Sequence, residues 1–356
     1  MPLPFLNSKA PRKDHILAVD LGVRNTKAVY IQKKGDGYQL VNYLIQDAPV
    51  YERGFSAEVL SNHLKTVTSA LGAKTKQIVI SSGVTDAIVR EAELPLSPIT
   101  DLRQMVKLNS KNYLQQDLPD HLFDCHIQGT VEARADAGKV PTKARVLVVA
   151  AKRQYVEDLQ LSAKTIGHVV DHVFPSLLAP SNAFELSNRE SFQKEVVALV
   201  DLGFKHSSIT IFAEGRMCLS RVVGIGGDKL TSGIAETLGV SYVEGENIKI
   251  GMAEEVQAIM QPLLSPLGRE LRASIDFFEH NQDKSVSQVY LSGGAAKSDF
   301  IIQTIQSDLM VPCKSWNPAS GFALALPAQQ QADIERDAPQ LAVVLGAAIA
   351  AIPVAE

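Results

Sequence analysis

The chain has 356 residues, of which 46% are hydrophobic and 21% charged, and its formal net charge is −4 at pH 7. This length exceeds one ordinary core of about 150 residues, so two domains with room for a small insertion are expected. The slightly negative charge and the lack of a dense lysine and arginine cluster exclude an ordinary nucleic-acid-binding protein.

Cysteine usage and the two ends of the chain bear on its compartment. Cys125, Cys218 and Cys313 are scattered, with neither a disulfide framework nor metal-ligand spacing, which is typical of the cytoplasm. Residues 1–14 lack the apolar centre of a signal peptide and are expected to form a disordered arm. The apolar run over 341–355 is shorter than the roughly 18 residues that span a bilayer, so it predicts a core helix.

The chain opens with a strand, a turn and a returning strand. Residues 19–29 read VDLGVRNTKAV, in which an apolar run ends at Asp20, turns at Gly22 and resumes after Lys27. The next segments alternate in type. They are expected to form a strand pair, an amphipathic helix and a strand, over residues 38–45, 56–72 and 77–82.

From about Gly83 to Arg145 the pattern changes, which indicates a small inserted subdomain. Its expected parts are a strand ending at Pro95, a helix over 97–114 capped by Ser97 or Thr100, a strand over 123–131 and a polar loop over 132–143. Leu102, Met105, Val106 and Tyr113 recur at helical spacing in this helix. Packing on the subdomain's own sheet and docking of a peptide are both open explanations of this stripe.

The first half closes near residue 190 with four further elements. They are expected as a strand over 144–151, a helix over 155–167, a strand over 169–174 and a proline-started helix over 175–188. Two histidine pairs in this half, His121 with His126 and His168 with His172, favour polar positions at strand edges over a metal site, because no third ligand is near in the sequence.

The second half repeats the opening pattern. Residues 200–212 read VDLGFKHSSITIF, which places Asp201 and Gly203 as Asp20 and Gly22 are placed. The rest predicts a glycine-rich bend before a helix, a proline-broken linker over 261–266, a helix over 268–282 and a strand that runs into two glycines. The chain is therefore a weak internal duplication of α/β type.

The repeated turns suggest a common chemistry. A carboxylate at the end of a buried strand can hold hydrated Mg²⁺, while the tight glycine turn directs backbone N–H groups at one point. Glycine lets the backbone approach a phosphate closely, and a basic residue neutralises the phosphate oxygens. A single copy is better explained by an ordinary hairpin turn. Two copies that face each other predict a polyphosphate clamp.

With these residues in place, the chain resembles the superfamily of actin, heat-shock chaperones and hexokinase, and so implies a duplicated actin-like ATPase (ribonuclease H-like) α/β fold. DLGVRNTK and DLGFKHSS resemble its two phosphate loops, LSGGAAKSDF its adenosine loop, and FPSLLAPSNA and LAVVLGAAIAA its two connecting helices. Within the superfamily the chain is most similar to the PilM family of type IV pilus assembly, which is related to FtsA. Four stretches carry this closer match: REAELPLSPITDLRQMVKLNSKNYL, RVLVVAAKRQYVEDLQLSAKTIG, GGDKLTSGIAETLGVSYVEGENIKIG and DAPQLAVVLGAAIAA.

The resemblance implies ATP and Mg²⁺ as cofactors. Asp20 and Asp201 would hold Mg²⁺ through water, Lys27 would reach the phosphates, Glu246 and Lys249 would contact the ribose, and Lys297 would lie against the adenine. The other implied nucleotide-binding residues are Gly22, Val23, Arg24, Asn25, Gly203, Phe204, Lys205, Ser207, Gly226, Gly227, Gly293, Gly294 and Ala295.

The resemblance also implies domains and a partner. The first actin-like domain would cover 15–82 and 146–192, the inserted subdomain 83–145, and the second domain 193–356, with its smaller part at about 226–285. The family implies a bitopic inner-membrane partner, PilN, whose cytoplasmic N-terminal tail docks beside the inserted subdomain. Leu102, Met105, Val106 and Tyr113 are the expected contact residues. The chain would then be cytoplasmic and reach the inner membrane only through that partner, and self-association is open.

Three departures from the superfamily pattern weaken the case for hydrolysis. Val23 stands where most relatives carry a phosphate-binding Ser or Thr, bulky Phe204 and charged Lys205 fill the second loop, and Phe174 stands where many bacterial relatives carry a water-activating Glu. Hydrolysis is therefore expected to be slow or absent. A nucleotide-binding scaffold is the favoured function, and a small-molecule kinase or a pseudo-ATPase that binds only proteins are the alternatives.

Overall fold

The structure is a computed structural model that describes residues 14–35, 37–50, 56–131 and 143–352. The expected disordered arm, apart from Asp14, and the expected polar loop, apart from Lys143, lie outside these ranges. Within the described ranges, no helix combines the length and the apolarity that crossing a membrane requires.

A six-stranded sheet forms the first domain, in the order β14-β3-β2-β1-β4-β8. Its strands are β1 (His15–Leu21), β2 (Asn25–Lys34), β3 (Gly37–Asp47), β4 (Gln77–Ser82), β8 (Val169–Pro175) and β14 (Ala323–Leu324). Alternate residues of β1 face opposite sides, as the pleat of a strand requires. Leu17 and Val19 pack with α1 (Ala57–Leu71) and α4 (Arg153–Thr165), whereas Ile16 and Ala18 pack with α12 (Ala342–Ala350).

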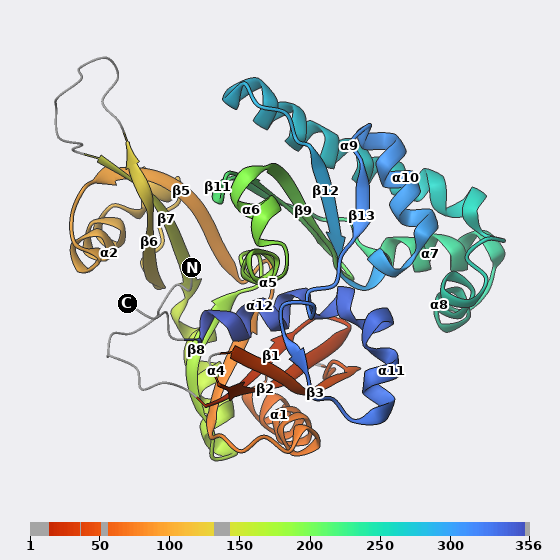
Figure 1. The fold of residues 1–356 in the computed structure, drawn as a ribbon, viewed down its shortest axis with the longest axis horizontal. Coiled ribbons are helices and arrows are strands. Elements are labelled where there is room, and N and C mark those ends of the chain that lie inside the picture. Colours follow the sequence, from red (N-terminus) through yellow and green to blue (C-terminus); the bar gives the residue numbers. More distant parts are fainter. Residues whose placement is uncertain (1–13, 36, 51–55, 132–142, 353–356) are drawn as a thin grey trace.

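The second domain repeats this plan in a five-stranded sheet of order β11-β10-β9-β12-β13. Its strands are β9 (Val196–Leu202), β10 (Ser207–Ala213), β11 (Arg216–Val223), β12 (Gln288–Ser292) and β13 (Cys313–Ser315). The other helices outside the inserted subdomain are α5 (Ala179–Ser187), α6 (Arg189–Lys194), α7 (Gly227–Leu238), α8 (Tyr242–Gly251), α9 (Gln257–Gln282), α10 (Asp299–Leu309) and α11 (Ala328–Asp337), with short turns η1 (Gly294–Lys297) and η2 (Ala338–Leu341). Figure 1 shows the two sheets in separate lobes with α5 and α12 between them. The duplication inferred from the sequence is therefore present in three dimensions.

The inserted subdomain is a separate three-stranded sheet of order β5-β7-β6 with helices on one face. It comprises β5 (Ala87–Pro95), α2 (Ile99–Leu108), α3 (Ser110–Leu114), β6 (His121–Val131) and β7 (Lys143–Lys152). Strand β7 pairs with β5 and β6. The insertion therefore extends to about residue 152, because a strand that the sequence assigned to the first domain completes the small sheet.

The end of the chain returns to the first domain. Strand β14 pairs with β3, and α12 packs against β1, β2 and β4. The expected assignment of the whole range 193–356 to the second domain is thus incomplete. Helix α12 also crosses α5 closely. A Cβ built on Gly346 would overlap the carbonyl oxygen of Ala179, and Asn182 donates a hydrogen bond to the carbonyl of Gly346 at 3.1 Å. Only glycine permits this close approach of the two connecting helices.

Two local expectations were wrong. Pro262 and Pro266 lie inside the continuous helix α9 instead of forming a linker, because Leu264, Leu267 and Leu271 bury one face of that helix and packing outweighs the missing hydrogen bonds. Helix α2 begins after Pro98 without a side-chain cap, so neither Ser97 nor Thr100 caps it.

Candidate nucleotide site and partner groove

The two repeated aspartates end matching strands on either side of the space between the domains. Asp20 ends the apolar part of β1 and pairs in register with Lys27 of β2, whose Nζ lies 3.5 Å from Asp20 Oδ2. Asp201 holds the same place on β9, and Ser292 donates a hydrogen bond to its Oδ1 at 2.8 Å. Burial raises the pKa of both carboxyl groups, and the positive charge of Lys27 opposes this rise in each. Both carboxylates are therefore short of compensating positive charge.

The glycines of the two turns are required by the same geometry. A Cβ on Gly22 would lie 2.5 Å from the carbonyl oxygen of Asn25, and a Cβ on Gly203 would lie 2.5 Å from that of His206. The backbone folds back on itself three residues later in both loops. Gly226 is equally constrained, since its Cβ would overlap the carbonyls of the second loop. These close backbone turns have the shape that phosphate recognition by N–H groups needs.

The start of α7 is joined to the second loop. The N–H groups of Gly227 and Asp228 donate to the carbonyls of Gly203 and Phe204 at 3.0 and 2.8 Å. The N-terminus of this helix, with its positive dipole end, therefore lies beside the second turn. The two hydrogen bonds fix the position of the second loop against α7.

Glu246 and Lys249, which the family resemblance assigns to the ribose, pair with each other on α8. Lys249 Nζ donates to Glu246 Oε2 at 2.6 Å and to Thr231 Oγ1 at 2.8 Å, and the Thr231 hydroxyl donates to Glu246. Burial opposes the ionised form, but these bonds hold the pKa of Glu246 below its ordinary value. The pair is a buried, preorganised polar cluster at the base of the second domain's smaller part.

Arg24 of the first loop contacts two elements of the second domain. Its guanidinium lies 5.3 Å from the centre of the Phe204 ring and 3.9 Å from Glu246. The first loop therefore contacts both the second loop and α8. Val23 beside it is 59% exposed, so its side chain packs little against the rest of the protein. Because valine has no hydroxyl, its side chain cannot hydrogen-bond to a phosphate.

The glycine pair after β12 supports the second loop. Gly293 has φ of 90°, and a Cβ there would lie 2.8 Å from the backbone nitrogen of Leu202. Its missing side chain thus faces the end of β9. Lys297, at the end of the short turn that Gly294 begins, pairs with Asp337 of α11 at 3.1 Å, and Asp337 also accepts from the Tyr43 hydroxyl. This contact ties the second domain to β3 of the first.

A cavity of about 270 Å³ lies where the inserted subdomain meets the first domain. We call it the junction cavity. It lies between the small sheet and the edge formed by β8 and α4, and most of its lining is apolar. Its lining residues are Ser82, Ala87, Arg103, Leu122, Phe123, Val149, Ala151, Val156, Gln160, Val170, Asp171, Val173 and Pro175.

A family model described as type IV pilus assembly protein PilM matches residues 18–352, nearly the whole chain. The chain belongs to the PilM family. It also resembles a solved chain described as the PilM-PilN type IV pilus biogenesis complex, with a TM-score of 0.81 and 19% identity, over 97% of this chain and 100% of that one.

Two further solved structures share the fold of this PilM-family chain. The ethanolamine utilization protein EutJ from Carboxydothermus hydrogenoformans matches with a TM-score of 0.57 and 14% identity, over 96% of this chain and 91% of that one. MreB 5 of Spiroplasma citri bound to AMPPNP matches with a TM-score of 0.51 and 12% identity, over 94% and 95% of the two chains. The duplicated actin-like ATPase fold is thereby confirmed.

Four further residues assigned to the nucleotide from the family resemblance make the following contacts. Ser207 is buried and its hydroxyl donates to the carbonyl of Ile225 at 2.7 Å, which braces the second loop. Asn25 donates to Asp47 at 3.1 Å on β3. Lys205 is exposed on the second loop, and Ala295 packs on the second domain's core.

Two site residues were missed from the sequence. Ser292 is hydrogen-bonded to Asp201, and Thr231 links Glu246 with Lys249. Ser292 directly precedes the glycine pair, and Thr231 lies one helical turn after Gly227, so their places in the motifs were the available signals. Their hydrogen-bond partners lie on other elements, Asp201 on β9 and Glu246 and Lys249 on α8, so the sequence motifs do not reveal the pairing.

The docking residues expected on α2 need correction. Leu102 and Val106 are fully buried in the core of the inserted subdomain, so a partner cannot contact them. Met105 and Tyr113 are only partly buried and pack against the same core. The subdomain's own sheet therefore accounts for the stripe at Leu102 and Val106.

Proposed function

We propose that this PilM-family chain is a cytoplasmic nucleotide-binding scaffold that docks the N-terminal tail of a PilN-like inner-membrane protein. The junction cavity carries the proposal. It is an apolar recess beside the inserted subdomain, in a fold that closely follows a chain solved in a PilM-PilN complex. Short extended tails bind such recesses through a few apolar anchors.

The two aspartate turns support ATP and Mg²⁺ as ligands of this scaffold. Among the described residues, no three His, Cys, Asp or Glu side chains gather as a metal site. Mg²⁺ takes one or two carboxylates and completes its shell with phosphates and water. Asp20 and Asp201 would hold the ion, which neutralises phosphate charge when bound. Lys27 and the backbone of both turns would hold the phosphates.

Hydrolysis by the purified chain should be slow or absent. Phe174, which stands where many bacterial relatives carry a water-activating Glu, is an apolar side chain buried in the first domain's core and cannot act as a base. Val23 supplies no hydroxyl to hold the terminal phosphate. We expect steady-state turnover of Mg-ATP below about 1 s⁻¹, the low end of ordinary enzymes. A coupled phosphate-release assay measures it. Faster turnover, or phosphate transfer to a small molecule, would favour the kinase alternative.

Tail docking is tested by a matched pair of variants on one strand. Val170 of β8 lines the junction cavity, whereas its neighbour Val169 is 64% exposed and does not line it. We expect Val170→Glu to weaken binding of the partner's cytoplasmic N-terminal peptide by about 30-fold or more, the cost of losing an anchor worth about 2 kcal/mol.

Calorimetric titration gives both affinities, and circular dichroism verifies the fold of each variant. Val169→Glu should bind as wild type does, because its side chain points away from the cavity. Equal affinities for the two variants would place the tail elsewhere and leave the scaffold proposal without its main support.

A further inference from the structure

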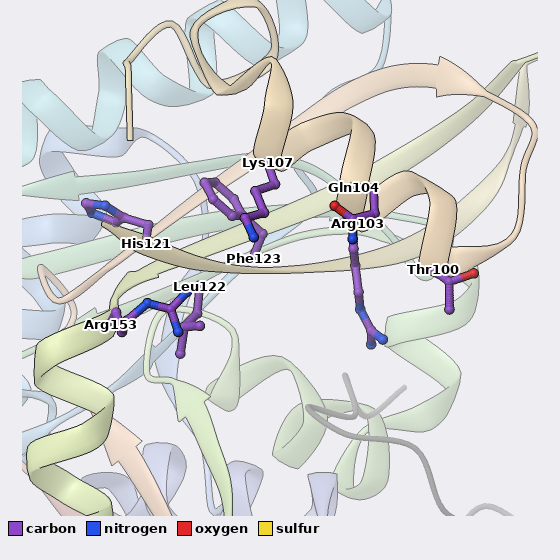
Figure 2. A pocket seen from close by; sticks show the side chains of 8 residues that line it. All are labelled: Thr100, Arg103, Gln104, Lys107, His121, Leu122, Phe123 and Arg153. Carbon is purple, nitrogen blue, oxygen red and sulfur yellow. The ribbon is translucent and has the colours of Figure 1, made fainter. Parts of the chain in front are cut away.

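A second cavity, of about 330 Å³, lies on the inserted subdomain between α2 and the start of α4 (Figure 2). We call it the cationic pocket. It is lined by two apolar residues, two uncharged polar residues, one histidine and three permanently charged cations, and no carboxylate is in its lining. These residues are Leu122, Phe123, Thr100, Gln104, His121, Arg103, Lys107 and Arg153.

Helix geometry explains why the cations gather here. Thr100, Arg103 and Lys107 follow one another at spacings of three and four on α2, so they share one face, while Leu102 and Val106 bury the other. Arg153 is the first residue of α4 and faces the same space from the other side, as Figure 2 shows. The positive dipole end of α4 adds to the charge of its side chain.

An ion pair with a buried carboxylate holds the Arg103 side chain in place. Its Nε and Nη2 lie 2.7 and 2.6 Å from Oδ1 of Asp124, which is 1% exposed. This carboxylate offsets the charge of Arg103, whereas Lys107 and Arg153 form no ion pair with a carboxylate among the described residues. The ring nitrogen Nδ1 of His121 is buried and has no partner among the described residues. The pocket is thus fixed in shape and short of negative charge.

The cationic pocket continues into the junction cavity. Arg103, Leu122 and Phe123 line both. A ligand that fills the apolar recess therefore has a neighbouring group within reach of the cations. Charge complementarity makes that group an anion.

We propose that the cationic pocket binds an oxyanion and that, in the assembled complex, this oxyanion is a carboxylate side chain of the docked tail. The second half of the proposal rests on the proposed tail docking. Arg153 and Lys107 hold the carboxylate, while Arg103 keeps its bond to Asp124 and orients the floor of the pocket. The carboxylate then fixes the register of the tail, whose apolar residues alone would slide.

The first experiment needs no partner. Inorganic phosphate is titrated at constant ionic strength into wild type, into the double variant Lys107→Gln with Arg153→Gln, and into the control Lys111→Gln with Lys164→Gln, which removes two exposed lysines outside the pocket. Wild type and control should show the same phosphate-dependent rise in melting temperature by mass action. The double variant at Lys107 and Arg153, called the pocket variant, should lose part of this rise in melting temperature, because only the candidate nucleotide site can still bind phosphate. Identical curves for all three proteins overturn the oxyanion site.

The second experiment identifies the source of the oxyanion. The partner's N-terminal peptide is compared with the same peptide in which every Asp and Glu is replaced by its amide. Wild type should bind the acidic peptide about tenfold more tightly, the equivalent of one charge-assisted contact, and the pocket variant should bind both equally. Equal binding of both peptides to wild type overturns the tail carboxylate, while the phosphate titration still decides the oxyanion site.

Failure of the proposed function gives a different result. If neither peptide binds wild type, or if Val170→Glu binds as tightly as wild type, tail docking at the junction cavity is wrong and the tail carboxylate falls with it. If the pocket variant still showed a smaller phosphate-dependent rise in melting temperature than the control, the result would support an oxyanion site that binds a free ligand.

Discussion

Replacing Gly346 with alanine is expected to lower the free energy of unfolding by at least about 2 kcal/mol, although alanine is normally the better helix residue. The added Cβ would overlap the carbonyl oxygen of Ala179, which is backbone and cannot rotate away. The two connecting helices α5 and α12 would have to separate, and the hydrogen bond from Asn182 to Gly346 would be lost. Urea unfolding followed by circular dichroism measures the change.

Gly251, at the end of α8, is the matched control. A Cβ there meets nothing within 4 Å, so Gly251→Ala should be neutral or slightly stabilising. If both variants lost the same free energy, or if Gly346→Ala were neutral, the close crossing of α5 and α12 would be wrong. Because these helices join the domains, a milder result with intact folding but altered nucleotide affinity would also contradict the stability prediction.

Asp201→Asn is expected to weaken Mg-ATP affinity by roughly 100-fold, because the amide cannot supply a carboxylate to the ion, and even loss of a residue that only supports a metal ligand costs 10- to 100-fold. The rise in melting temperature that saturating Mg-ATP gives to wild type should be almost absent in this variant. Thermal-shift titration across millimolar Mg-ATP measures both quantities.

The same substitution should not destabilise the nucleotide-free protein. Burial raises the pKa of Asp201, so folding favours the protonated form, and at pH 7 the ionised carboxylate costs stability that a neutral amide avoids. Ser292→Ala, which removes only the donor to Asp201, should weaken Mg-ATP binding less. An unchanged Mg-ATP shift in Asp201→Asn would refute the site, and a large loss of stability without ligand would refute the electrostatic argument.

Local sequence signals located the two aspartate turns. The repeated Asp-Leu-Gly placed Asp20 and Asp201 at matching strand ends, because strand, turn and returning strand are encoded by neighbouring residues. The glycines followed for the same reason, since Gly22 and Gly203 each meet a carbonyl only three residues away. Contacts of such short range leave a direct trace in sequence spacing.

Contacts with a distant element left no trace in the sequence. The motif gave no sign that the Ser207 hydroxyl donates to the carbonyl of Ile225, which follows β11 in the chain. Leu102 and Val106 showed a helical stripe that fits a core or a docking face equally. The position of the small sheet decides between a core and a docking face, because the sheet covers Leu102 and Val106 completely.

The sequence by itself determined the α/β duplication, the two aspartate turns and the presence of an insertion, because periodicity and turn chemistry are local properties of the chain. Tertiary structure alone decided that β7 belongs to the small sheet, that Pro262 and Pro266 lie within a helix, and that α12 returns to the first domain. It also brought Arg103 of α2 and Arg153 of α4 to one pocket. Each of these depends on the burial of surfaces far apart in sequence, and the free energy of that burial outweighs local preference.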